Sequence, residues 1–208
     1  MRNLSISKLK AYRQCPKRLW LELHKPELRD DSGSQASFAR GDEVVRVAQQ
    51  IFDPEGVGIN VDPHLIGWDA SAEQTQVALR TGDRTVFEAL LQIPGAMALA
   101  DVMRPDPNFS ELRWEMIEVK ASTSVKDYHR DDVAIQTYIA DESGVPLSKS
   151  MLAHIDTNFV YAGDGDYSGL LHLEDLTEEA RARHEEVGTW IEEAQAIAAM
   201  ATEPVVKT

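Results

Sequence analysis

The chain has 208 residues, of which 43% are hydrophobic and 27% are charged, and its formal net charge is −14. This length matches one globular domain, and the apolar fraction is sufficient for a core, which excludes a disordered chain. No apolar run reaches the roughly 18 residues of a membrane span, and the opening sequence MRNLSISKLK lacks the apolar segment of a secretion signal. We therefore expect a single domain over residues 1–208 that acts in the cytoplasm and has no membrane partner.

The charge is distributed unevenly along the chain. Residues 1–25 hold seven Lys or Arg and one acidic residue, a balance of +6, so the remaining 183 residues sum to −20. A basic arm on an acidic body can bind a polyanion on one face. The candidate nucleic-acid contacts in this arm are Lys8, Lys10, Arg13, Lys17 and Arg18. An ordinary solvated helix face is the alternative, since exposed Lys and Arg are common on any helix.

The first half of the chain predicts mainly helices. Ser5 is a suitable N-cap for a first helix, and Pro16, which would break that helix, fits the first position of a second one. Gly82 is suited to end a later helix. The predicted elements are helices over 5–14 and 16–24, a loop over 29–37, a helix over 38–52, a strand over 57–61 and a helix over 71–81.

The second half predicts strands that follow one another, with helices around them. The turn-forming pair Pro94-Gly95 and the segment 104–110 separate the first three strands. The predicted strands cover 85–92, 96–103, 113–121, 150–154, 158–162 and 169–173, the last as a hairpin partner, and the predicted helices cover 130–141 and 175–202. This order is typical of an α/β or α+β domain.

Three polar residues in two of these strands point to chemistry. Side chains alternate between the two faces of a strand, so Glu118 and Lys120 share one face while Val119 takes the other. By the same rule, Asp101 shares a face with the apolar Leu99. Burying an unpaired charge costs several kcal/mol, so Asp101 should be paired, bound to a metal ion, or in water at the end of its strand.

If the two strands are neighbours, Asp101 and Glu118 can converge on one divalent cation. Carboxylate oxygens with open water positions suit Mg²⁺ or Mn²⁺. Lys120 beside them can orient an attacking water and stabilise the charge that develops on a phosphoryl oxygen. Two plainer interpretations stay open: Glu118 and Lys120 as a weak ion pair on an exposed strand face, and Asp101 as the start of the turn into 104–107.

These residues resemble a known pattern. Asp101 followed by Glu118-Val119-Lys120 resembles the D…(D/E)-x-K signature of the PD-(D/E)XK nuclease superfamily. Residues 4–20, LSISKLKAYRQCPKRLW, are similar to the opening S-x-S-x-[LF]…C-P-x-R pattern of its RecB-like branch, which includes the AddB and CRISPR-adaptation nucleases. Residues 132–138, DVAIQTY, are similar to that branch's helix after the catalytic strand, which carries Q-x-x-x-Y. The segments keep the family's order over about 140 residues.

The resemblance implies a restriction-endonuclease-like α/β core with a mixed central sheet flanked by helices. It also implies Mg²⁺- or Mn²⁺-dependent hydrolysis of DNA phosphodiester bonds, by a RecB-like exonuclease or single-strand nuclease in repair, recombination or defence. Its partners would be single-stranded DNA or DNA ends, and a helicase or a further domain of a longer protein. The implied metal ligands are Asp101, Glu118, the Val119 carbonyl and Glu88, and the implied catalytic residues are Lys120, which positions the water, Gln136 and Tyr138.

Two departures from the family pattern favour an alternative. Tyr138 follows Gln136 by two residues instead of four, so the two do not share a helix face. Iron–sulfur relatives pair an early cysteine with three late ones, whereas Cys15 is the sole cysteine here, so this chain alone cannot hold an iron–sulfur cluster. The chain is then a cluster-free variant or the first part of a longer protein. The alternative function is a catalytically inactive nuclease-fold module for DNA binding or complex assembly, which the acidic body also favours.

Overall fold

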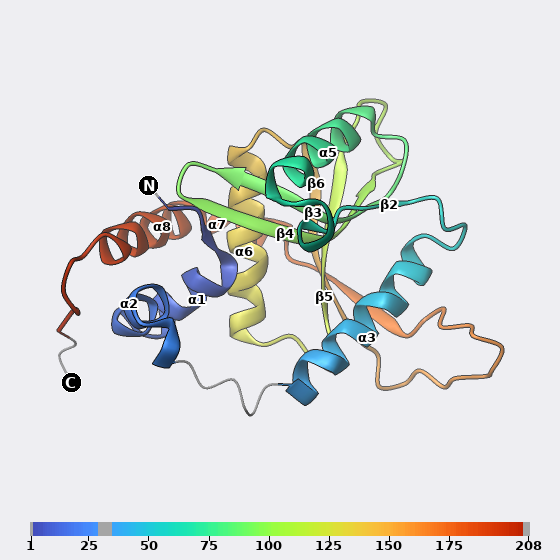
Figure 1. Cartoon of the computed structure of the whole chain (residues 1–208). Helices are drawn as coiled ribbons and strands as arrows, with labels where there is room; N and C mark the ends of the chain where they lie inside the picture. Colours follow the sequence, from blue (N-terminus) through green and yellow to red (C-terminus); the bar gives the residue numbers. More distant parts are fainter. Residues whose placement is uncertain (1, 29–34, 206–208) are drawn as a thin grey trace.

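A mixed β-sheet with helices on both faces forms the centre of the molecule (Figure 1). The computed structural model describes residues 2–28 and 35–205. Within them the strand order is β2-β3-β4-β5-β6-β7, and β1 pairs with β4 outside that path. The strands are β1 (Leu4–Ser5), β2 (Ile59–Asn60), β3 (Val86–Ile93), β4 (Ala96–Pro105), β5 (Trp114–Lys120), β6 (Leu147–Ile155) and β7 (Leu171–Asp175). The predicted α/β class is confirmed.

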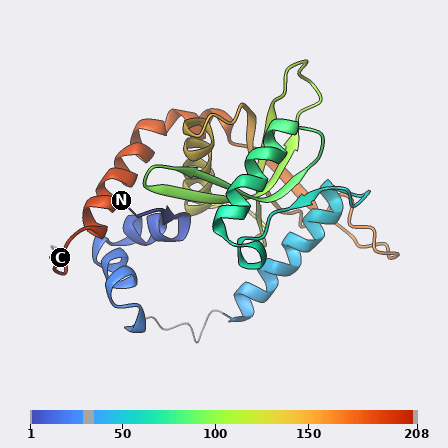
Figure 2. The ribbon, with the colours of Figure 1, turned by 45° about the horizontal axis from the view of Figure 1, so that its top comes forward.

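The helices divide between the two faces of the sheet. Helix α3 lies on one face, and α6 lies on the other with α1 and α8 packed around it (Figures 1 and 2). The helices are α1 (Ile6–Gln14), α2 (Pro16–His24), the short 3-10 helix η1 (Pro26–Leu28), α3 (Gln35–Phe52), α4 (Pro63–Ile66), α5 (Trp68–Thr81), α6 (Asp127–Glu142), α7 (Thr177–Ala182) and α8 (His184–Ala198). Two apolar clusters, one on each face, form the core.

The first half matches its prediction closely. Helices α1 and α2 meet at Cys15-Pro16, and Gly82 ends α5 with a φ of 67°. Of the predicted loop over 29–37, residues 29–34 lie outside the described residues, and the rest belongs to α3. Strand β1 and helix α4 were not predicted; both are too short for a periodic pattern to mark them.

Two predictions for the second half are wrong. The segment 158–162 is not a strand, and β7 pairs antiparallel with β6 instead. Aromatic and β-branched residues alone did not make a strand there, and Val160 is 82% exposed. The single helix predicted over 175–202 is two helices, α7 and α8, broken at Arg183. The Thr177 hydroxyl accepts a hydrogen bond from the Ser150 N–H at 2.9 Å and fixes α7 to β6, whereas α8 turns away to pack on α1 and α2.

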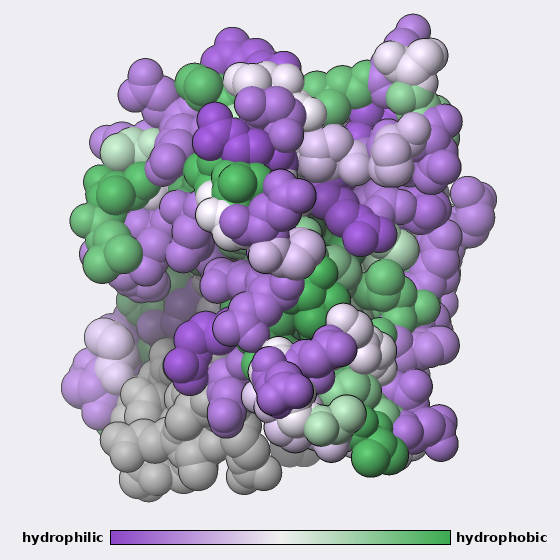
Figure 3. Space-filling view, turned by 90° about the vertical axis from the view of Figure 1, so that its right-hand side faces the viewer, coloured by the Kyte–Doolittle hydropathy of each residue, from purple (hydrophilic) through white to green (hydrophobic). Residues whose placement is uncertain are grey.

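The two ends of the described chain lie together (Figure 2). The Trp20 indole N–H donates to the Met200 carbonyl at 2.9 Å, and the Gln195 side-chain amide donates to the Arg2 carbonyl at 2.6 Å. The side of the molecule shown in Figure 3 is mostly hydrophilic, with apolar groups scattered between. No helix within residues 2–28 and 35–205 combines the length and apolar character that crossing a membrane requires.

Candidate active site

The candidate site lies where β4 and β5 separate. Their backbone pairing runs from Pro105 opposite Trp114 to Val102 opposite Ile117, and the next opposed residues would be Asp101 and Glu118. Instead, the Val119 N–H donates a hydrogen bond to the Asp101 carboxylate at 2.7 Å. A side-chain oxygen of β4 is therefore the acceptor where regular pairing would use a backbone carbonyl. The expected neighbourhood of the two strands is confirmed, and it brings Asp101 to the Glu118-Val119-Lys120 segment.

The strands are also irregular at this point. Ala100 and Met103 both belong to the larger apolar cluster, although strict alternation would place them on opposite faces of β4. Alternation along β4 is therefore broken between Ala100 and Val102, so it does not by itself fix the face of Asp101. On the adjacent strand β3, Glu88 has a φ of 55°, a left-handed conformation that costs a non-glycine residue about 1 kcal/mol or more. Strained backbone of this kind is concentrated at functional sites.

Glu118 and Lys120 lie on the same face of β5, as predicted, and this face is covered by α6. The Lys120 ammonium donates to one oxygen of Glu118, and the Gln136 side-chain amide of α6 donates to the other. The same ammonium lies 3.0 Å from an oxygen of Asp132, one helical turn before Gln136. Contacts within β5 and from α6 thus hold the Glu118 carboxylate and the Lys120 amine in place.

Asp132 extends this network to the N-terminal arm. Its carboxylate, with a side chain only 2% exposed, lies 2.9 Å from the ammonium of Lys10 in α1. It therefore bridges Lys10 and Lys120, two lysines from distant parts of the chain. The sequence analysis missed Asp132 as a site residue. Its position four residues before Gln136, which places both on one helix face, would have indicated it.

Electrostatics at the site follow from burial and from these contacts. Burial raises the pKa of Asp101 well above its usual range, and Glu118 raises it further, while Lys120 acts in the opposite direction. Burial lowers the pKa of Lys120, but Glu118 and Asp132 outweigh it, so that pKa is raised. Burial, and next the charge of Lys120, lower the pKa of the buried His129 to about 4. At neutral pH Lys120 is charged and His129 is neutral.

Asp101 and Glu118 offer the kind of oxygen donors that a small divalent cation takes. They are neighbouring acidic groups in a buried setting, where a cation would offset their repulsion, and their oxygens match the donors that Mg²⁺ and Mn²⁺ prefer. Among the described residues, no group of three or more His, Cys, Asp or Glu side chains is arranged to hold a metal ion. Glu88 is close enough to influence the pKa of Asp101, but it does not complete such a group. The Val119 amide binds Asp101; a role for its carbonyl stays a prediction.

Tyr138 lies apart from the acidic cluster, which comprises Asp101, Glu118, Lys120, Asp132 and Gln136. Its ring contacts the His184 ring of α8 edge-on, with ring centroids 5.4 Å apart. A Cβ at Gly188 of the same helix would lie 3.2 Å from the Tyr138 hydroxyl oxygen. Tyr138 therefore packs α6 against α8, on a different side of α6 from Gln136, as its two-residue spacing from Gln136 indicated.

Most of the basic arm is engaged in ion pairs within the chain. Lys10 reaches the acidic cluster, whereas the other four residues contact groups elsewhere. These contacts are Lys8 with Glu22 at 2.9 Å, Arg18 with Glu22 at 2.8 Å, Lys17 with Glu203, and Arg13 with Asp131 at 3.9 Å and over the Trp190 ring at 3.8 Å. The arm therefore carries less uncompensated positive charge than its sequence suggested.

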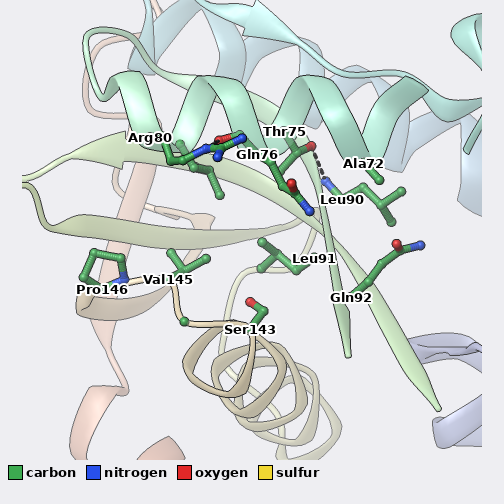
Figure 4. Close-up of a pocket in the computed structure, with 12 residues that line it drawn as sticks. Ala72, Thr75, Gln76, Arg80, Leu90, Leu91, Gln92, Ser143, Val145 and Pro146 are labelled. Atoms are coloured by element: carbon green, nitrogen blue, oxygen red, sulfur yellow. Dashed lines mark hydrogen bonds between the residues drawn. The ribbon is translucent and has the colours of Figure 1, made fainter. Parts of the chain in front are cut away.

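A pocket of about 350 Å³ lies away from this cluster, between α5, β3 and the segment after α6 (Figure 4). Leu91 and Val145 contribute apolar walls, and Gln76, Gln92 and Arg80 contribute polar groups. None of the predicted site residues lines it.

Comparison with known proteins adds little. No family model matches the chain, and no curated protein matches it. The solved structure of a protein called SSO0001 is similar over 98% of this chain and 79% of its own, with 13% sequence identity and a TM-score of 0.41. A similarity of this strength carries no conclusion about function, so the site stands on its own geometry.

Proposed function

We propose that this protein is a metal-dependent nuclease that hydrolyses DNA phosphodiester bonds. The observation that carries the proposal is the convergence of Asp101, Glu118 and Lys120 where β4 and β5 separate. The buried acid Glu118, the half-buried acid Asp101 and one charged amine at a single point would supply both a place for a divalent cation and a group that can orient water.

Each residue has a role in this proposal. Asp101 and Glu118 would hold Mg²⁺ or Mn²⁺, which supplies a Lewis acid for the phosphoryl oxygens and a more acidic bound water. Lys120 positions the attacking water and stabilises negative charge as it develops. Gln136 fixes the orientation of the Glu118 carboxylate, and Asp132 fixes the Lys120 amine.

The sequence resemblance suggests the kind of nuclease. We propose a restriction-endonuclease-like core and a RecB-like exonuclease or single-strand nuclease of repair, recombination or defence, acting in the cytoplasm on single-stranded DNA or DNA ends. A helicase or a further domain of a longer protein would be its partner. With Cys15 the sole cysteine of the sequence, this chain alone cannot hold an iron–sulfur cluster.

A catalytically inactive nuclease-fold module, kept for DNA binding or complex assembly, is the second candidate. It is favoured by the lack of a three-ligand group among the described residues and by the position of Tyr138 outside the cluster. The net charge of −14 opposes tight binding of a polyanion, so within this candidate it favours complex assembly over DNA binding.

Two substitutions test the nuclease proposal. Lys120→Ala and Glu118→Ala should each abolish release of nucleotides from labelled single-stranded DNA in the presence of Mg²⁺ or Mn²⁺. Lys149→Ala is the matched control and should retain activity. Lys149 lies on β6, next to β5, and forms an ion pair with Glu115 of β5. Circular dichroism should show that all variants are folded.

The same experiment separates the two candidates. Digestion by Lys120→Ala and Glu118→Ala at the rate of the parent would contradict the nuclease proposal. A parent protein that binds DNA, but neither cleaves it nor binds Mn²⁺ stoichiometrically in calorimetry, would support the inactive module instead.

A further inference from the structure

A row of three nitrogen-bearing side chains crosses the sheet from the candidate active site to its edge. Lys120 of β5 is opposite His154 of β6, and His154 is opposite His172 of β7. The two imidazole rings lie with centroids 5.2 Å apart and planes tilted by 45°. Because residues directly opposite each other on neighbouring strands project from the same face, the three side chains form one continuous row.

The row lies on the face that carries the active site. One step back along the strands, Glu118 is opposite Leu152, which belongs to the apolar cluster beneath α6. Neighbouring strands are about 4.8 Å apart, so the backbone at His172 is about 10 Å from the backbone at Lys120. His154 is half-buried and His172 is exposed, and β7 is the last strand of the sheet order. The row therefore leads from the enclosed site into solvent.

The surroundings of the row carry charges of both signs. Helix α6 starts at Asp127, shortly after Lys120, and the N-terminal end of a helix carries partial positive charge. The acids nearest on β7 and α7 are already engaged: Arg130 of α6 binds Glu174 at 2.7 Å and also binds Glu179. Arg130 offsets only one of these two carboxylate charges, so a net charge of −1 remains there, and the donors for an anion must come from the histidine side chains themselves.

We propose that His154 and His172 form a second phosphate-binding position, which holds the DNA strand as it leaves the active site across β6 and β7. The inference rests on the proposed function and specifies the path of its substrate. A ring nitrogen that carries a proton donates a hydrogen bond, and hydrogen bonds to a charged phosphate are stronger than those between neutral groups. The Ile155 carbonyl, 3.2 Å from His154 Nδ1, restrains the inner ring.

A double substitution, His154→Gln with His172→Gln, tests this position. His64→Gln, which changes an exposed histidine of α4 away from the row, is the matched control. The affinity for a labelled DNA single strand of about 12 nucleotides, a length within the usual range of single-strand sites, is measured by fluorescence anisotropy. EDTA is included so that no metal ion bridges the two imidazoles.

Steady-state cleavage is then compared on two substrates. One is the same DNA, and the other is a chromogenic ester of thymidine monophosphate that contains a single phosphate. We expect the double variant to bind the DNA about tenfold more weakly and to raise its KM by about the same factor, since it loses hydrogen bonds to a charged group. The kcat for DNA and the hydrolysis of the single-phosphate ester should stay at the parent's values. Replacement of the exposed histidine by a different nitrogen donor, His172→Lys, should preserve DNA affinity.

Failure of the inference can be distinguished from failure of the proposed function. If the parent cleaves both substrates and the double variant matches it on DNA, the second phosphate position is wrong and the nuclease stands. If the parent cleaves neither substrate, the proposed nuclease function is wrong. The anisotropy measurement alone then tests whether His154 and His172 bind a phosphate. Equal affinity of parent and double variant, or no DNA binding by the parent, overturns the inference. Loss of ester hydrolysis by the variant would also overturn it, because the histidines would then act within the active site itself.

Discussion

Asp132 joins two lysines that are 110 positions apart in the sequence, Lys10 and Lys120. Its carboxylate is almost fully buried, and it holds the amine to which the proposal assigns the orientation of water. Groups that orient a catalytic side chain commonly matter nearly as much as that side chain itself. Asp132 is therefore the site residue whose role the structure reveals and the sequence analysis missed.

Asp132→Asn should lower the kcat for DNA by about 10- to 100-fold, the usual effect of losing an orienting partner. The amide keeps the shape of the side chain but removes one of the two carboxylates that hold the Lys120 amine. Single-turnover cleavage of labelled DNA is the measurement, and DNA affinity should change much less than kcat. The neighbouring Asp131→Asn, which loses an ion pair with Arg183 instead, is the control. Equal kcat values for the two variants would contradict the role of Asp132.

His129 should make stability depend on pH. Its pKa in the folded protein is about 4, below its ordinary value of 6.5, so the unfolded chain binds more protons between these two values. The free energy of unfolding should therefore rise with pH from about 4 to 6.5 and gain no more from His129 above that range, with a total contribution of about 1–3 kcal/mol.

Denaturant titrations at several pH values check this expectation for His129. The parent should lose more stability on acidification than His129→Gln does, whereas His64→Gln, at an exposed position, should follow the parent. A pH dependence that survives unchanged in His129→Gln would show that the lowered pKa is wrong.

The sequence predicted the centre of the site but not its surroundings. Glu118 and Lys120 share a face because strand side chains alternate, a local rule that a sequence reveals directly. The contact of Lys10 with Asp132 depends on how α1 docks on α6, across 122 positions, and no local pattern encodes that. The irregularity at Asp101 likewise arises between strands and leaves no trace in the periodicity of either one.

At the scale of elements, the α6–α8 contact gives Tyr138 a structural role. Tyr138→Phe should therefore keep DNA cleavage within about twofold of the parent, since loss of one hydroxyl distant from Lys120 removes no group of the site. Cleavage of labelled DNA measures this. A loss of kcat comparable to that of Lys120→Ala would place Tyr138 in the active site after all.

Gly188 provides an independent check on the same contact. An alanine there would gain about 0.5–1 kcal/mol of helix stability, but its Cβ would meet the Tyr138 hydroxyl. Gly188→Ala should accordingly stabilise the Tyr138→Phe variant more than it stabilises the parent, as measured by denaturant titration. An equal effect in both backgrounds would show that the two helices do not meet as described.

The positions of the long helices and strands could be predicted from the sequence, but the elements that each one packs against could not. The strands β3, β4 and β5 were located to within two residues, because each is bounded by turn-forming residues. The segment 158–162 has strand-forming residues but no neighbouring strand, and strand propensity reflects packing against neighbours more than the backbone itself. The break at Arg183 follows from the different docking of α7 and α8, which a continuous helical periodicity conceals.

At the scale of the whole molecule, ion pairs compensate most of the basic arm. Lys17→Gln with Arg18→Gln should change the affinity for single-stranded DNA by less than about twofold, because these side chains already bind Glu203 and Glu22. Anisotropy titrations over a range of salt concentrations measure this. If both residues contacted phosphates, the double substitution would reduce the slope of log affinity against log salt by about 1.4, and that result would restore the arm as a DNA-binding surface.

The pairing of β1 with β4, together with the contacts of α2 with α8, has a consequence for biosynthesis. Strand β1 emerges from the ribosome before its partner strand, because Ala96 follows Leu4 by about 90 residues, a delay of about 5 to 20 s at ordinary translation rates. The helix that covers Trp20 is made later still. During that interval the apolar surfaces of α1 and α2 have no native neighbour to cover them, so nascent chains should depend on a chaperone at this stage, and Lys10 cannot join its acidic partner until most of the polypeptide has been made.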